Sequence, residues 1–415
     1  MPRPVTFIHA ADLHLGAPFG SVDAGDERVR RALAAAPYQA LERVVDACVS
    51  RAVDFLVIAG DVYEDADPAL PVRAALARAM ARLGEAGITA FAVNGNHDPA
   101  SGAAAAGTPP NVRYFSTAIA ERTVVEREGE TLAALYGRGY ERREQPEDLA
   151  AGFRREPGDR VAIGVLHTNV GGRPDDGSYA PSTLEDLRAA GMDYWALGHI
   201  HQPELVLDTP RARYAGCVQG LNPKETGPRG CWVVTVEGRH VADEFVETDS
   251  VRWAAEEVDV TGAESEDAVL ARACEACDRV RDAAGGRPSV VRLTLTGRSG
   301  AHRRLLRPGA GGHLLDAVRD DQLRGPDWVW VDRVADASRP ETDASVYADA
   351  DNFVGEIVRI ASAKIADPAA AARLVAARTD GVVARFRIEG FTPDPASVVS
   401  RALDLCLDGL VGEEE

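Results

Sequence analysis

The sequence predicts an α/β protein in which a large domain with two helix-covered sheets precedes a smaller α/β module and a mostly helical tail. Up to about residue 200, short β-branched runs alternate with helical stretches, as in α/β folds. Near residue 250 the pattern restarts, and beyond residue 337 apolar residues recur mainly at helical spacing. These patterns define expected domains at residues 1–248, 249–336 and 337–415.

The first expected domain is a four-layer αββα sandwich. Its central strands are predicted from short apolar runs, which are typical of strands buried on both faces: Val5–His9, Asp54–Ala59, Thr89–Val93, Val161–Leu166 and Tyr194–Leu197. Helices are predicted between them, for example at Arg28–Val53 and Pro71–Gly84. A second sheet is predicted from four further segments, Asn111–Phe115, Thr123–Glu126, Thr131–Tyr136 and Gly230–Val236.

The other two expected domains are smaller. Residues 249–336 have a β-α-β-α-β pattern, with segments at Val251–Val260, Glu264–Ala284, Val290–Thr296, Gly312–Leu323 and Trp328–Val334. The tail is predicted to be mostly helical, with helices at Val346–Ile365, Pro368–Arg378 and Pro395–Leu410 and a strand at Val382–Ile388. Since the last helix has an apolar stripe, we expect it to pack on its own domain or on a partner.

Composition excludes several classes of protein. No uncharged run approaches the roughly 20 residues of a membrane span, and the apolar stretch near the N-terminus is too short for a signal peptide. We therefore expect a cytoplasmic protein without membrane attachment, in which six scattered cysteines form no disulfide framework. The net charge of −19 argues against a broad, nonspecific nucleic-acid surface, but it is compatible with a local basic groove.

Polar residues stand just after five of the predicted strands. They form five short clusters: Asp12 with His14, Asp61, Asn96 with His97, His167, and His199 with His201. In open α/β sheets, ligand sites form beyond the carboxyl ends of the strands, so these clusters are expected to converge in one crevice. Singly, such motifs are weak, but five in order at strand ends are difficult to explain by structure alone. His9, within the first strand, is expected to be a core or supporting residue.

These residue types suit two divalent cations and phosphoester chemistry. A carboxylate can bridge two ions, imidazoles and an amide oxygen complete each shell, and a position stays open for water or a phosphate oxygen. Ions about 3.5–4 Å apart can share a hydroxide that attacks phosphorus in line. Because the donors are nitrogen and oxygen, Mn or Fe is favoured over a structural zinc, although zinc stays an alternative. Gly60, Gly95 and Gly198 are expected to permit tight turns at the strand ends.

At these residues the sequence resembles the calcineurin-like metallophosphoesterase superfamily, over roughly residues 5 to 235. Within it, the sequence resembles the bacterial SbcD-type DNA repair exonucleases, particularly the YhaO subgroup. Two further stretches support this resemblance, Ile8–Gly16 and Tyr214–Cys231. The expected fold of the first domain is therefore the metallophosphoesterase sandwich.

The resemblance also implies a role for each polar residue. The expected ligands of the first metal are Asp12, His14, Asp61 and His201, and those of the second are Asp61, Asn96, His167 and His199. His97 is expected to stabilise the pentacoordinate phosphorus and to protonate the leaving oxygen. Glu64, three residues after the bridging Asp61, is expected to orient His97, with Asp65 as an alternative.

Further expectations concern activity and partners. The resemblance implies a manganese-dependent DNA nuclease in DNA repair, acting as an exonuclease and a single-strand endonuclease. Residues 249–336 stand where the family has a capping domain that discriminates DNA, and residues 337–415 stand where it docks onto an SMC-like, SbcC-like ATPase. A homodimer is also compatible with the resemblance.

Four arginines are candidate phosphate contacts: Arg138, Arg173, Arg303 and Arg304. Taken singly, each is explained more readily as an ordinary solvated charge. Two other functions compete with the nuclease. One is a phosphodiesterase or phosphatase for a nucleotide or small molecule, which the acidic net charge suits better. The other is a non-enzymatic scaffold, which the complete ligand set disfavours.

Overall fold

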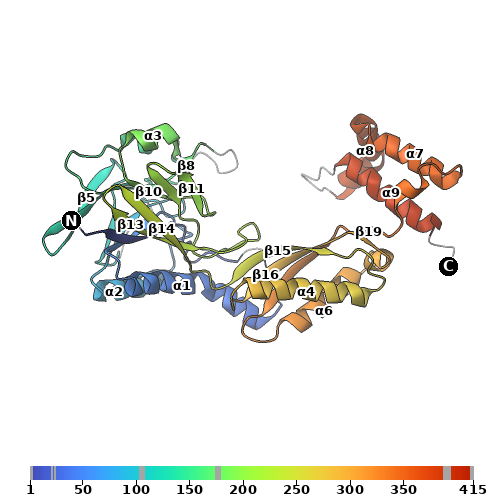
Figure 1. Ribbon diagram of the computed structural model, residues 1–415, viewed down its shortest axis with the longest axis horizontal. Coiled ribbons are helices and arrows are strands. Elements are labelled where there is room, and N and C mark those ends of the chain that lie inside the picture. The colour runs from blue at the N-terminus through green and yellow to red at the C-terminus, as the bar shows by residue number, and fades with distance from the viewer. Residues whose placement is uncertain are drawn as a thin grey trace. The chain divides into compact units, whose positions relative to one another are not determined.

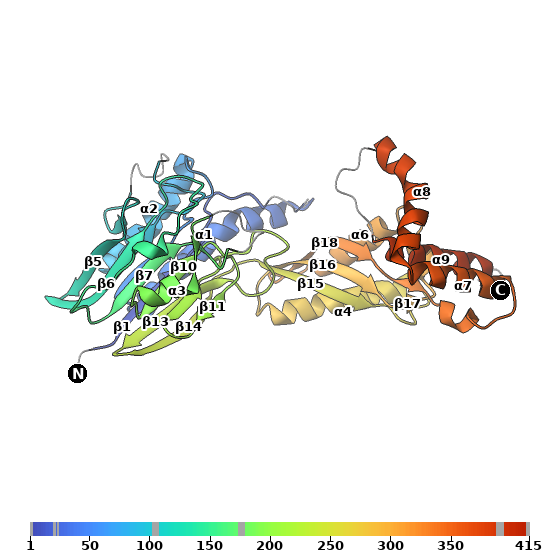
Figure 2. The ribbon, with the colours of Figure 1, turned by 90° about the horizontal axis from the view of Figure 1, so that it is seen from above.

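The computed structural model describes residues 3–19, 22, 25–101, 108–172, 179–386 and 394–411. The chain divides into two compact units, one formed by Met1–Ala254 with Arg287–Val290 and the other by Ala255–Gly286 with Val291–Glu415. Figures 1 and 2 show the elements of both units. Within the described ranges, none of the helices combines the length and apolar character that crossing a membrane requires.

The first unit contains two six-stranded sheets. The first sheet has the order β14-β13-β1-β2-β3-β4, and the second has the order β11-β12-β10-β7-β6-β5. The strands of the first sheet are β1 (Val5–Ala10), β2 (Phe55–Ala59), β3 (Thr89–Val93), β4 (Val112–Tyr114), β13 (Gly230–Glu237) and β14 (His240–Glu247). Those of the second are β5 (Glu121–Arg127), β6 (Glu130–Arg138), β7 (Ala162–His167), β10 (Tyr194–Gly198), β11 (Glu204–Leu207) and β12 (Arg211–Tyr214).

Helices cover the outer faces of the two sheets. Helices α1 (Glu27–Ser50) and α2 (Leu70–Glu85) lie along the first sheet, and α3 (Leu184–Ala189) lies over the second (Figure 1). Three layers of buried apolar residues separate these elements, with Leu41 and Met80 under the helices of the first sheet, Phe7 and Phe55 between the sheets, and Trp195 beneath α3. The predicted αββα sandwich is confirmed.

The prediction was wrong about which strands share a sheet. It grouped the strands now labelled β7 and β10 with β1, β2 and β3, whereas they lie in the second sheet. Conversely, β4 and β13 were expected in the second sheet but belong to the first, where β13 pairs antiparallel with β1. Pairing between segments more than 200 residues apart is set by tertiary packing, which local sequence patterns do not contain. As a result, the strands that carry the polar clusters are divided between two sheets.

The second unit has the predicted β-α-β-α-β order. Its sheet has the order β15-β16-β18, and its main elements are β15 (Arg252–Asp259, which starts in the first unit), α4 (Glu266–Ala283), β16 (Ser289–Thr296), α6 (Ala310–Gln322) and β18 (Val329–Asp336). The short α5 (His302–Leu305) precedes α6, and β17 (Arg298–Ser299) pairs with β19 (Arg339–Pro340).

The tail is helical, as predicted. It consists of α7 (Phe353–Ile365), α8 (Pro368–Phe386) and α9 (Pro395–Val411). The strand predicted at Val382–Ile388 is wrong up to residue 386, because α8 continues through that segment, and its last two residues lie outside the described ranges. Extending an existing helix adds one hydrogen bond per residue without a new nucleus, which outweighs the weak β preference of a short valine-containing run.

Candidate metal centre

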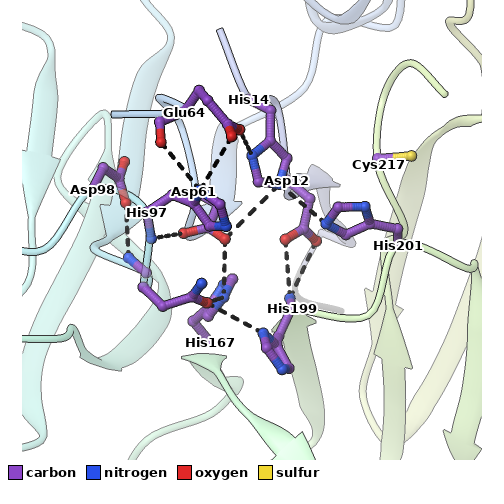
Figure 3. Close-up of polar contacts among 12 residues, drawn as sticks. Asp12, His14, Asp61, Glu64, His97, Asp98, His167, His199, His201 and Cys217 are labelled. Atoms are coloured by element: carbon purple, nitrogen blue, oxygen red, sulfur yellow. Dashed lines mark hydrogen bonds and ion pairs between the residues drawn. The ribbon is translucent and has the colours of Figure 1, made fainter. Parts of the chain in front are cut away.

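The structure brings all eight predicted side chains together at the carboxyl ends of strands from both sheets (Figure 3). The chain segments after β1, β2 and β3 carry Asp12, His14, Asp61, Asn96 and His97, and the ends of β7 and β10 lead to His167, His199 and His201. Strands β7 and β10 are parallel and adjacent, with Gly198 opposite His167. The convergence therefore depends on two sheets whose carboxyl ends meet at one edge of the sandwich.

One half of the site, here called the Asp12 cluster, consists of Asp12, His14 and His201. Their potential ligand atoms all lie within 4.8 Å of one another. The Nε2 atoms of His14 and His201 are 3.1 Å apart. Asp12 is held by the main-chain amide of His199, which donates to its carboxylate at 3.1 Å.

The hydrogen bonds of these two histidines show why a cation fits between them. His14 Nδ1 donates to Glu64 Oε2 at 2.8 Å, and His201 Nδ1 donates to Glu225 Oε1 at 2.7 Å. In the neutral imidazoles both Nε2 atoms are therefore unprotonated, so two lone pairs face each other. This contact is repulsive unless a proton or a metal ion lies between them.

The other half of the site, here called the Asn96 cluster, consists of Asn96, His167 and His199. His167 Nδ1 donates to the carbonyl oxygen of Ala59 at 2.9 Å. Its Nε2 faces Asn96 Oδ1 at 2.9 Å and Asp61 Oδ2 at 3.4 Å, while His199 Nδ1 lies 3.3 Å from the same amide oxygen. Because Nδ1 is the donor, Nε2 of neutral His167 is an acceptor that faces two oxygen atoms, so this half also suits a cation. Asp61 Oδ2 is 3.9 Å from His14 Nε2, which places it between the two clusters.

The shifted pKa values of the buried side chains also indicate that the site favours positive charge. Burial favours neutral His14, but its hydrogen bond to Glu64 and the charges of Asp61 and Asp12 outweigh this and raise its pKa to about 9. Burial also disfavours the charged form of His167, yet Asp61 raises its pKa to about 9. For Asp61 itself, burial is outweighed chiefly by His167, and its pKa is held well below the usual range. Without metal, protons occupy the positions that suit cations.

The backbone at the strand ends is unusual. Asp12, His14, Asp61 and His199 have φ angles of 51°, 44°, 49° and 101°. Non-glycine residues adopt this left-handed region at a cost, and they persist there only where the surrounding structure enforces it. This conformation turns each chain sharply after its strand and directs the side chain into the site.

The three strand-end glycines are needed mainly for space. A Cβ atom would lie 2.3 Å from His167 Nδ1 at Gly60, 2.2 Å from Asp61 Oδ1 at Gly95, and 1.9 Å from the Ala59 carbonyl oxygen at Gly198. All three glycines were expected to permit tight turns at the strand ends. Only Gly60 has a positive φ, of 95°, so at Gly95 and Gly198 the close approach of other atoms is the reason for glycine.

His97 lies beside the ligands and is held by the main chain. Its amide donates to Asp61 Oδ1 at 2.9 Å, and its Nδ1 donates to the carbonyl oxygen of Glu64 at 3.1 Å. The Glu64 carboxylate was expected to orient His97, but it accepts from His14 and lies 3.6 Å from His97 Nδ1. Glu64 thus orients the catalytic candidate through its backbone and a metal-ligand candidate through its side chain.

Sequence reasoning missed two supporting carboxylates. Glu225 accepts from His201, and Asp98 accepts from the amides of Val62 and Gly95 at 2.8 and 2.9 Å. Burial and the nearby Asp61 raise the pKa of Asp98 to about 7. Asp98 directly follows Asn96 and His97, so its position was a usable signal, whereas Glu225 lies 24 residues from its partner.

The candidate DNA contacts are dispersed. Arg138 ends β6 beside β7, but its guanidinium donates to the Thr117 carbonyl at 3.1 Å and lies 3.7 Å from Glu147. Arg303 and Arg304 belong to α5 in the second unit, where Arg304 donates to the carbonyl of Glu264. Arg173 lies outside the described residues. Two of the four arginines therefore already bind main-chain oxygens.

The sandwich and its paired clusters of nitrogen and oxygen donors define a metallophosphoesterase, a class whose members use two divalent metal ions. Residues 5–203 match the calcineurin-like phosphoesterase family, and residues 253–339 match the middle domain of metallophosphoesterase YhaO. The chain belongs to the calcineurin-like metallophosphoesterases and, within them, to the YhaO family. It is 33% identical to "Uncharacterized metallophosphoesterase YhaO" of Bacillus subtilis, over 83% of this chain and 84% of that protein.

More distant relatives are archaeal proteins named "DNA double-strand break repair protein Mre11". The protein from Methanopyrus kandleri is 26% identical over 60% of this chain and 57% of its own length. The protein from Haloferax volcanii is 29% identical over 65% of this chain and 58% of its own length. This chain therefore spans little more than half the length of these two proteins.

Proposed function

We propose that the protein is a metal-dependent DNA nuclease that acts in DNA repair as an exonuclease and a single-strand endonuclease. The observation that carries this proposal is that His97 lines the same pocket as His14 and His201, so a phosphodiester held at the metal ligands meets a proton donor. The names of the archaeal relatives support DNA as the substrate.

The side chains divide the work of hydrolysis. Two bound cations would make water a better nucleophile and neutralise charge on the phosphoryl oxygens. The Asp12 and Asn96 clusters, with Asp61 between them, would hold these ions. His97 Nδ1 is occupied by the Glu64 carbonyl, so in the charged imidazole Nε2 carries the proton that the leaving oxygen needs. The Glu64 carboxylate lies 3.6 Å from the same Nδ1 atom.

The exposure of the site supports a polymeric substrate. The side chains of His97 and His201 are 26% and 33% exposed, so a backbone phosphate can reach them from outside. A phosphodiesterase or phosphatase for nucleotides or small molecules is the second candidate, since the net charge of −19 suits it better.

The proposal includes metal and partners. Carboxylate, amide and imidazole donors without a thiolate favour Mn²⁺, with Fe or Zn as alternatives. The middle domain would contact DNA, and the helical tail would dock onto an SMC-like, SbcC-like ATPase in the cytoplasm, with homodimerisation also compatible. Large apolar side chains on the tail support a docking role, since Phe353, Ile360 and Leu405 are 68%, 56% and 53% exposed.

The test is direct. Purified protein is incubated with Mn²⁺ and end-labelled single- or double-stranded DNA, with and without a chelator. We expect nucleotide release that the chelator abolishes and that the ATPase increases. Rapid turnover of a cyclic nucleotide or mononucleotide ester together with inert DNA would favour the second candidate. Undiminished cleavage after exhaustive chelation would exclude the metal mechanism.

A further inference from the structure

His201 is the more exposed of the two histidines whose Nε2 atoms face each other. Its side chain is 33% exposed, compared with 3% for His14. Surrounding atoms therefore restrict the His201 ring less than the His14 ring, and its orientation depends more on its hydrogen bonds. The hydrogen bond from Nδ1 to Glu225, 2.7 Å long, fixes the ring and keeps Nε2 unprotonated toward the site.

Glu225 is in turn held by its own loop. Its Oε2 accepts from the amide of Leu221 at 2.6 Å, and its Oε1 accepts from the side-chain amide of Asn222 at 2.6 Å. The guanidinium of Arg229, which is 2% exposed, donates to the carbonyl oxygens of His201 and Glu225 at 2.6 and 3.3 Å. The loop thus fixes both the carboxylate and the backbone of the histidine that it orients.

Trp253 connects this loop to the start of β15. Its indole Nε1 donates to the Gly220 carbonyl at 3.2 Å, and its own carbonyl accepts from the amide of Gly227 at 2.9 Å. Trp253 is 1% exposed, and a Cβ on Gly220 would lie 3.2 Å from the indole and 2.8 Å from the Glu225 carbonyl oxygen. Trp253 therefore forms hydrogen bonds with both ends of the segment that carries Glu225.

We propose that Glu225 is the positioning residue for His201, and that Trp253 acts through Glu225 by bracing the loop from Gly220 to Gly227. The inference deepens the metal centre on which the proposed function rests. Neither Glu225 nor Trp253 is proposed to contact the substrate or the reacting atoms.

A different role for Glu225 is as a metal ligand itself. Its carboxylate, His201 and Cys217 offer ligand atoms within 4.8 Å of one another, and Cys217 Sγ lies 4.0 Å from Glu225 Oε2. However, Glu225 Oε1 and Oε2 both already accept short hydrogen bonds from the loop and from His201. These contacts favour positioning over direct ligation.

The first test is the binding of Mn²⁺ alone to Glu225→Gln, measured by titration calorimetry of the full chain. The glutamine loses the charge and turns an NH₂ group toward the Leu221 or Asn222 donors, so it cannot keep all three hydrogen bonds. We expect one of the two ions to bind about 10–100-fold more weakly, with two ions still bound at saturation. The matched control is Glu237→Gln, at an exposed carboxylate at the end of β13, which should bind Mn²⁺ like the unmodified chain.

The second test asks whether Trp253 acts through Glu225. Trp253→Phe removes the indole donor and should weaken the same ion roughly two- to tenfold. The Trp253→Phe/Glu225→Gln double variant should bind no more weakly than Glu225→Gln. If Trp253→Phe does not fold, Asn222→Ala removes a donor to Glu225 and should also weaken that ion without adding to Glu225→Gln.

Several outcomes would overturn the inference. Unchanged Mn²⁺ affinity in Glu225→Gln would show that Glu225 does not position His201. Loss of one ion from the binding stoichiometry would show that Glu225 is itself a metal ligand. Additive losses of affinity in the double variant would show that Trp253 does not act through Glu225. Failure of the proposed function looks different, because DNA would stay intact while Mn²⁺ binding and hydrolysis of an activated phosphodiester such as bis(p-nitrophenyl) phosphate persist.

Discussion

Histidines in the two halves of the metal centre are held by different kinds of partner. In the Asp12 cluster, His14 and His201 donate to the carboxylates of Glu64 and Glu225. In the Asn96 cluster, His167 donates to the carbonyl oxygen of Ala59, at the end of β2. The orientation of His14 and His201 therefore depends on carboxylate side chains in loops, which a substitution can remove. The orientation of His167 depends on the main chain at the end of a strand. Substitutions can weaken one half of the centre while the other keeps its geometry.

The largest effect is expected at Asp61, which belongs to both halves. Asp61→Asn keeps an oxygen for the amide of His97 and tolerates the left-handed backbone, but it loses the charge shared by the clusters. We expect no measurable hydrolysis and loss of tight binding for both Mn²⁺ ions in calorimetry. Retention of one ion at full affinity would mean that Asp61 does not bridge the clusters.

His97 should separate catalysis from metal binding. Removal of the imidazole in His97→Ala takes away the proton donor and should lower kcat by roughly 10²- to 10⁴-fold, while both Mn²⁺ ions bind as before. Stopped DNA cleavage assays measure the first quantity and titration calorimetry the second. Because an activated nitrophenyl ester needs little protonation of its leaving group, its hydrolysis should fall much less. Equal losses on both substrates would remove the general-acid role.

Glu64→Gln tests the Asp12 cluster alone. The carboxamide still accepts from His14 but lacks the negative charge that makes this imidazole a stronger metal ligand, and we expect the ion of that cluster to bind about 10–100-fold more weakly. The second ion should be unaffected. Simultaneous weakening of both ions would show that the two halves are not independently supported.

Gly198→Ala is the counterpart for the Asn96 cluster. The new Cβ would meet the Ala59 carbonyl at 1.9 Å and His167 Nδ1 at 3.0 Å, so we expect a loss of about 1–3 kcal/mol in the free energy of unfolding and weaker binding of one ion. Thermal unfolding with and without Mn²⁺ measures both effects. Gly312→Ala in α6, where the Cβ meets open space, is the control and should be neutral or slightly stabilising. A fully stable Gly198→Ala variant would contradict the close packing of the two strand ends.

A last effect, shared by both halves, is a dependence of Mn²⁺ affinity on pH. His14 and His167 have pKa values of about 9 without metal, so near neutral pH each holds a proton that a metal must displace. Mn²⁺ affinity should rise up to about tenfold per pH unit for each proton released, levelling off near pH 9. The stability of the metal-free protein should change in the opposite direction. A raised pKa in the folded state stabilises fully below the ordinary value of 6.5 and loses that contribution as pH rises toward 9. Calorimetry in buffers of different ionisation enthalpy counts the protons, and a pH-independent affinity would contradict this account.

Local sequence was a good guide to which residues form the centre. Each predicted cluster follows a strand, and strand ends are recognisable from a short apolar run followed by glycine and a polar residue, as at Ala59, Gly60 and Asp61. The same reasoning did not predict which strands share a sheet, because β13 pairs with β1 although the two strands are far apart in the sequence. Pairing partners are chosen by packing between distant segments, and a single sequence does not display that choice.

Supporting residues were harder to predict than the candidate metal ligands. Glu225 lies in a loop without a regular pattern, and its role follows only from the fold of that loop against His201 and Trp253. Glu64 was identified, but the part played by its side chain was not, because carboxylate and carbonyl of one residue serve different histidines. Which group of a residue contacts which histidine depends on the direction of that group in space, and the spacing of residues in the sequence does not specify this direction.

The left-handed backbone at Asp12, His14, Asp61 and His199 links the stability of this fold to its metal centre. Each such residue costs roughly 1–3 kcal/mol, which the buried apolar layers on either side must offset. A descendant freed from hydrolysis would gain robustness by relaxing these four positions, since activity and stability oppose each other there. The four main-chain torsions are therefore a cost in stability that the site imposes on the fold.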